Sequence, residues 1–121
     1  MPLIVLWFRA FVWTLLIEEV VAGVMLRQAV PAWGRRCSII AVANLASHPA
    51  VWLIFPELCS SLGFSRSASL IVSEIWAFGL EGWIYWLFLG SSQTKLALKT
   101  TIAANAVSLG LGYGLRHLGW V

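Results

Sequence analysis

The chain has 121 residues, of which 60% are hydrophobic and 11% are charged, and its formal net charge is +3. Soluble domains are nearer half apolar and about a quarter charged, so this composition is typical of an integral membrane protein. The basic residues are spread over the ends of apolar segments instead of forming one patch, which argues against nucleic acid as a partner and for a lipid bilayer.

Four apolar segments follow one another along the chain, separated by prolines, glycines and charges. We expect helices at about residues 3–26, 37–55, 68–89 and 96–118. Each is close to the ~20 residues that cross a hydrocarbon core about 30 Å thick. None has the polar outer face of a helix in a soluble bundle. The predicted fold is therefore an all-α integral membrane protein, a single transmembrane domain over residues 1–121 with four helices in an up-down antiparallel bundle.

The basic residues predict an orientation. The two odd-numbered loops and their flanks carry Arg27, Arg35, Arg36, Lys95 and Lys99. The opposite side has Arg66, Arg116 and Arg9, the last inside the first predicted helix. The positive-inside rule places the side with more Lys and Arg in the cytoplasm. We therefore expect both termini to be non-cytoplasmic, most simply in a bacterial inner membrane.

The first two predicted helices carry polar residues at positions that a bilayer penalises. Glu18 and Glu19 lie within LLIEEVVAGVML, and a charge at the bilayer centre costs at least about 2.5–3.5 kcal/mol. Such residues usually face the protein interior, where they have partners. In the second helix Asn44 and His48 are four residues apart and share a face. Pro49 follows them, and a kink is expected there because proline cannot donate a backbone hydrogen bond.

The third predicted helix carries two more glutamates. Glu74, Glu81 and Tyr85 recur at spacings that place them on one helical face. Gly79 and Gly82 flank Glu81 and would let another helix approach closely.

The fourth predicted helix has a polar stripe of its own, formed by Thr101, Asn105, Ser108 and Gly112. No internal repeat is convincing, although the first and third helices both carry pairs of glutamates.

The depths of these residues predict a polar ladder through much of the bilayer. The expected order from the cytoplasmic side is Glu18, Asn44, Asn105, Glu81, His48, Glu74 and Glu57. The candidate ion or proton path consists of Glu18, Glu19, Asn44, His48, Glu74, Glu81, Tyr85 and Asn105. Carboxylates with an imidazole could also hold a divalent metal ion, for which the candidate ligands are His48, Glu74 and Glu81.

The sequence argues more against enzymatic activity than for it, and a membrane enzyme ranks third among the functions considered. Glu18–Glu19 resembles the opening of the EExxxR motif of the CAAX prenyl protease family, but Gly23 stands where that motif has its arginine. His48 is the only histidine expected within the membrane, whereas that family has histidines on two further helices.

Two functions of different classes remain open. The first is a small membrane protein that binds or conducts a proton or cation along the ladder, as a homo-oligomer. The second is a non-catalytic accessory subunit of a larger membrane complex. In that case the polar residues would be interhelical glue, each hydrogen bond contributing about 0.6 kcal/mol.

Overall fold

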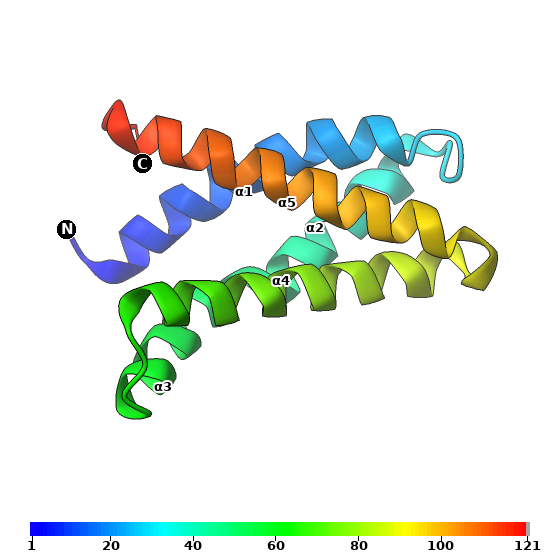
Figure 1. The fold of residues 1–121 in the computed structure, drawn as a ribbon. Helices are drawn as coiled ribbons and strands as arrows, with labels where there is room; N and C mark the ends of the chain where they lie inside the picture. Colours follow the sequence, from blue (N-terminus) through cyan, green and yellow to red (C-terminus); the bar gives the residue numbers. More distant parts are fainter. Residues whose placement is uncertain (121) are drawn as a thin grey trace.

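The computed structural model describes residues 1–120 and contains helices and turns only (Figure 1). Its four long helices are α1 (Leu3–Met25), α2 (Trp33–Pro49), α4 (Arg66–Leu89) and α5 (Thr94–His117). The shorter elements are the π-helical turn η1 (Ala50–Ile54), α3 (Phe55–Ser61) and the 3-10 turn η2 (Ser91–Gln93). The prediction of an all-α chain with four long helices is confirmed.

The four long helices form a closed ring. Helix α1 packs against α2 and α5, and helix α4 packs against the same two helices. Successive long helices run in opposite directions, so both chain ends and α3 lie at one end of the bundle (Figure 1). We call this the terminal end. The α1–α2 connection and the α4–α5 turn lie at the opposite end, which we call the loop end.

The second helix extends beyond the end predicted at residue 55. Helices α2, η1 and α3 follow one another without a break, so the end expected at Phe55 is wrong. Pro56 lies in the first turn of α3, and the wide π-helical turn comes directly before it. A proline ring clashes with the carbonyl group of the preceding turn in a regular helix, and a π-helical turn relieves that clash. Pro49, where a kink was expected, lies inside α2 with ordinary helical backbone angles, and the π-helical turn begins at the next residue.

One continuous helix in the described part of the chain is long and apolar enough to cross a membrane, judged by length and composition alone. It is the 29-residue stretch Trp33–Ser61, which covers α2, η1 and α3. The other three long helices do not meet that criterion. Each contains three charged residues, and in α1 and α4 two of the three are glutamates.

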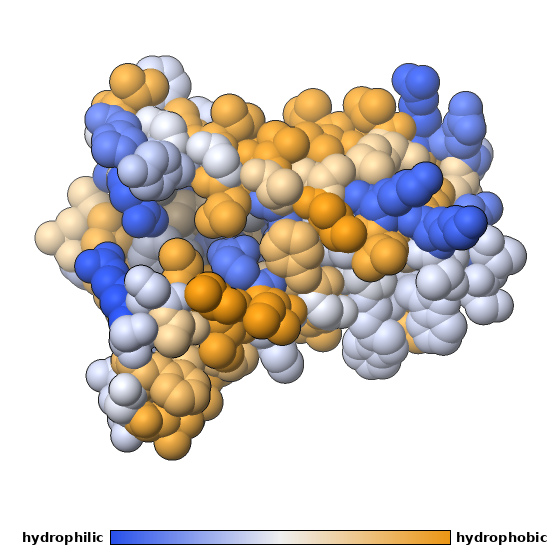
Figure 2. Space-filling model, in the orientation of Figure 1, coloured by the Kyte–Doolittle hydropathy of each residue, from blue (hydrophilic) through white to orange (hydrophobic). Residues whose placement is uncertain are grey.

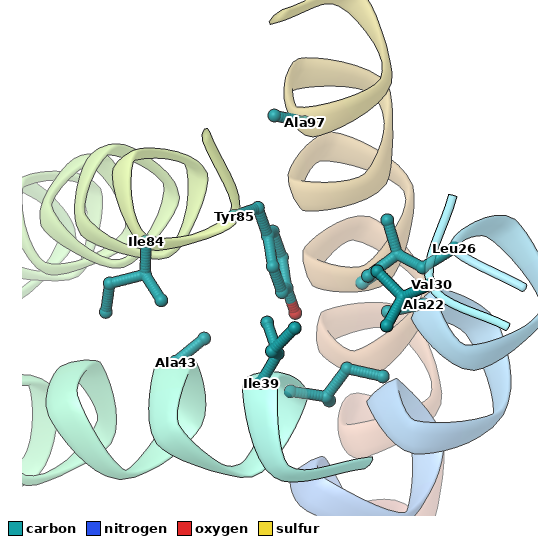
Figure 3. Packing of buried hydrophobic residues seen from close by; sticks show 10 residues of the cluster. Ala22, Leu26, Val30, Ile39, Ala43, Ile84, Tyr85 and Ala97 are labelled. Atoms are coloured by element: carbon teal, nitrogen blue, oxygen red, sulfur yellow. The ribbon is translucent and has the colours of Figure 1, made fainter. Parts of the chain in front are cut away.

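The loop half of the bundle has an apolar core. Tyr85 of α4 is fully buried and points toward α1, α2 and α5 (Figure 3). Tyr85 belongs to a cluster of buried residues whose other members are small or branched: Ala22, Leu26, Val30, Ile39, Ile40, Ala43, Ile84, Ala97 and Ala104. We call this group the apolar plug.

The outer surface is also hydrophobic. Apolar side chains cover the middle of the bundle, and hydrophilic ones gather at its two ends (Figure 2). Val20 and Ile75, for example, are both 67% exposed. A soluble monomer rarely exposes so continuous an apolar surface.

Gly82 and Gly79 give a matched test of the packing between α4 and α5. A Cβ atom at Gly82 would lie 3.1 Å from Cγ2 of the buried Thr101, whereas at Gly79 it would meet nothing within 4 Å. We expect Gly82→Leu to destabilise the fold by about 1–3 kcal/mol, as overpacking does, and Gly79→Leu to leave it nearly unchanged. Thermal unfolding in detergent measures both. Equal effects of the two substitutions would contradict this packing.

Candidate functional site

Glu18 is held at the centre of the bundle by two helices. Its side chain is 1% exposed. One carboxyl oxygen accepts a hydrogen bond of 2.9 Å from the side-chain amide of Asn44 on α2. The other accepts one of 3.1 Å from the hydroxyl of Ser108 on α5. Both oxygens of this buried group therefore have a partner.

Glu81 is held in the same way on the opposite side. It is 2% exposed, and one carboxyl oxygen accepts a hydrogen bond of 2.8 Å from the hydroxyl of Ser47 on α2. The other oxygen accepts from the side-chain amide of Asn105 on α5. The same amide also donates to the backbone carbonyl of Thr101, which fixes its orientation. We call Glu18, Glu81 and these four donors the carboxyl centre.

The carboxyl centre has a two-fold pattern. In the hairpin α1–α2 and again in the hairpin α4–α5, the first helix supplies a glutamate and the second supplies an asparagine and a serine. Each glutamate accepts from the asparagine of its own hairpin and the serine of the other. The bundle is therefore two similar hairpins joined by reciprocal hydrogen bonds.

A sequence signal for this repeat exists. The pattern Ala-Asn-x-x-Ser occurs once on α2, at residues 43–47, and once on α5, at residues 104–108. The interpretation that the sequence has no convincing internal repeat overlooked this pattern. Ser47 was also not predicted as a site residue. Asparagine and serine three residues apart lie on one helical face, so both can reach across to neighbouring carboxyl groups.

A cavity of about 380 Å³ leads from the terminal end of the bundle to the carboxyl centre. Glu18, Glu81, Ser47, Asn105 and Ser108 line its inner part. Its walls are largely apolar and aromatic, with Trp13 and Trp52 among them. Hydrophilic atoms are visible within the hydrophobic band between α4 and α5 (Figure 2).

Glu74 lies in the wall of the same cavity. Its side chain is half-buried. Glu74 lies seven residues, or about two helical turns, closer to the terminal end than Glu81. Within residues 1–120 no side chain or backbone group donates a hydrogen bond to it. Glu74 thus differs from Glu18 and Glu81, because its carboxyl group has no fixed partner.

His48 also lines the cavity, but in an aromatic setting. Its ring lies 5.3 Å from the ring of Phe11 and 6.4 Å from the rings of Trp7 and Trp52. Its buried Nδ1 atom has no hydrogen-bond partner among the described residues. No hydrogen bond joins His48 to Glu74 or Glu81 in the described part of the chain.

Three predicted path residues do not reach the cavity lining. Glu19 lies on another face of α1, beside Arg36 and Cys37 in a shallow surface depression. Tyr85 belongs to the apolar plug, and its buried hydroxyl has no partner among the described residues. Asn44 contacts the carboxyl centre through Glu18 without lining the cavity.

The metal interpretation receives no geometric support. Within residues 1–120 there is no group of three or more His, Cys, Asp or Glu side chains placed to share a metal ion. The candidates His48, Glu74 and Glu81 line one cavity, but they do not converge on a point. The cavity lining combines carboxyl groups, hydrogen-bonding side chains and aromatic rings, and it also includes the guanidinium groups of Arg66 and Arg116.

The reciprocal hydrogen bonds predict a specific pattern of coupling. Asn105→Leu should destabilise the bundle by about 1–3 kcal/mol, because it leaves a buried carboxyl oxygen without its donor. Combining it with Glu81→Leu should cost less than the sum of the two single losses, since both partners are then removed. Asn44→Leu combined with Glu81→Leu should be closer to additive. Thermal unfolding of the five variants measures this, and equal coupling of Glu81 to both asparagines would contradict the pairing.

No protein-family model, curated protein or solved structure significantly matches this chain.

Proposed function

We propose that this protein is integral to a membrane and that its four long helices all span the bilayer. The proposal is supported by the apolar outer surface, by the hydrophilic ends and by helix lengths of 17 to 24 residues, with α2 extended by η1 and α3. Glu18 of α1 and Glu81 of α4 do not oppose it, because both are turned inward and hydrogen-bonded. Polar groups satisfied inside the bundle do not meet the lipid.

The proposed function is the binding of a proton or small cation in the cavity. The observation that carries it is the convergence of Glu18, Glu74 and Glu81 on one cavity that opens at the terminal end. Glu74 supplies the oxygen atoms available to a ligand, because it alone has no donor. Glu18 and Glu81 place two further carboxyl groups beneath it, and carboxyl groups inside a membrane protein commonly mark ion or proton paths.

The cavity does not continue to the loop end. Beyond the carboxyl centre the bundle is filled by the apolar plug around Tyr85. The predicted ladder is thus interrupted in that half, and transport along it would require the plug to open. We therefore propose a binding site that is open to one side of the membrane. An oligomeric, gated transporter with such a site would work by alternating access.

A second candidate function rests on the hydrogen bonds themselves. All four oxygens of Glu18 and Glu81 have partners, as expected of interhelical glue. The apolar outer surface could be covered by subunits of a larger assembly as well as by lipid. An accessory subunit would need its carboxyl centre for folding and would not need Glu74.

The topology is tested at the C-terminus. We expect both termini outside the cytoplasm, because Arg27, Arg35, Arg36, Lys95 and Lys99 gather toward the loop end. A C-terminal alkaline phosphatase fusion should be active, and a green fluorescent protein fusion at the same position should be dark. The reverse pattern would place the cavity opening in the cytoplasm and contradict the orientation.

Substitution of Glu74 separates the two functions. Glu74→Gln removes the charge while breaking no hydrogen bond, so the fold should persist and cation binding or flux should fall at least about ten-fold, equivalent to ~1.4 kcal/mol. Glu57→Gln is the matched control, because Glu57 is exposed on α3 and does not line the cavity. Liposome flux and calorimetric binding provide the measurements. Unchanged binding in Glu74→Gln would favour the accessory subunit.

A further inference from the structure

The cavity holds charges of both signs that are not paired with one another. Arg66, at the start of α4, and Arg116, near the end of α5, are exposed residues that line it together with the half-buried Glu74. Neither guanidinium group forms a side-chain hydrogen bond or an ion pair within residues 1–120. Opposite charges left apart in one cavity are complementary to a ligand that carries both signs.

The axial order of these charges is set by the helices. Arg66 and Glu74 are eight residues apart on α4, or about 12 Å along the axis. Arg116 and Ser108 have the same separation on α5, so Arg116 also lies toward the terminal end relative to the carboxyl centre. The two cations thus lie toward the mouth and the carboxyl groups lie deeper.

The two-fold pattern shows which cavity residues are specific to one half. Counting seven residues back from each buried glutamate gives Phe11 on α1 and Glu74 on α4. The residue after each serine of the repeated pattern is His48 on α2 and Leu109 on α5. The carboxyl centre repeats because both hairpins need it for packing. Glu74 breaks the repeat, is unpaired and faces the cavity, and these are the properties of a ligand contact.

We propose that the cavity binds a zwitterion, an organic molecule with an ammonium group and an anionic group. This deepens the proposed cation site and rests on it. The ammonium group lies against Glu74 above the carboxyl centre, with Trp13 and Trp52 contacting its alkyl part, and the anionic group binds Arg66 and Arg116 at the mouth. Arginine suits this role because its planar fork binds carboxylate and phosphate groups in a bidentate manner.

Two sources could supply this chemistry. One is a small amino acid from the aqueous phase, and the other is the ammonium-phosphate headgroup of a zwitterionic lipid. Both present the same pair of charges to the cavity. A short-chain phosphatidylethanolamine and a free ω-amino acid distinguish them experimentally.

The test uses the full chain in detergent and three ligands that each contain four carbon atoms: 4-aminobutyrate, butylamine and butyrate. A short-chain phosphatidylethanolamine is titrated beside them by calorimetry. We expect 4-aminobutyrate, the lipid or both to bind at least about ten-fold more tightly than butylamine or butyrate. The double variant Arg66→Gln/Arg116→Gln should lose this preference while still binding butylamine. The control Arg27→Gln/Arg35→Gln, altered toward the loop end, should keep it.

The results distinguish a failure of the proposed zwitterion binding from a failure of the proposed cation binding. If butylamine binds as tightly as both zwitterions, the proposal of zwitterion binding is wrong, whereas the proposal of cation binding still holds. A preference that survives the loss of Arg66 and Arg116 would also overturn the proposal of zwitterion binding. If none of the four ligands binds, the cation site and the zwitterion fail together.

Discussion

The structure depends on the exchange of hydrogen bonds at its centre. Each buried glutamate accepts from the asparagine of its own hairpin and from the serine of the other, so neither hairpin is complete alone. A buried carboxyl group without these donors would be costly in an apolar bundle. The need to satisfy four oxygen atoms therefore fixes the register of α1 and α4 against α2 and α5.

The same centre divides the bundle into two unlike halves. Toward the loop end, the helices close around Tyr85 and small apolar residues. Toward the terminal end, they leave a cavity whose wall carries Glu74 and whose mouth carries Arg66 and Arg116. The π-helical turn and α3 prolong α2 at this open end. Packing thus accounts for the repeated residues, and the unpaired charges of the open half account for the proposed binding.

Much of the fold could be predicted from the sequence. Long apolar segments and their breakers predicted four helices. The second begins at Trp33 instead of residue 37, and it continues past residue 55 because a π-helical turn admits Pro56 without ending the helix. Glu18, Glu81, Asn44 and Asn105 could be predicted as interior residues, since lipid excludes them. Their hydrogen-bond partners could not be predicted, because helical spacing identifies the face on which a residue lies but not the residue that it contacts. Tyr85 shares the face of Glu81 but falls in the plug, since depth along that face decides its surroundings.

The proposed cation site lies above the carboxyl centre, in a cavity that extends to the terminal end. Ala77 lines this cavity between Glu74 and Glu81, so it reports on the site without removing either carboxyl group. A single cysteine can be placed there as Ala77→Cys in a chain whose Cys37 and Cys59 are replaced by alanine. We expect a cationic, membrane-impermeant thiol reagent to react with it only from the side of the termini, and an alkylammonium ion to slow the reaction. Reaction only from the side of the loops, or a rate that no ammonium ion changes, would contradict it.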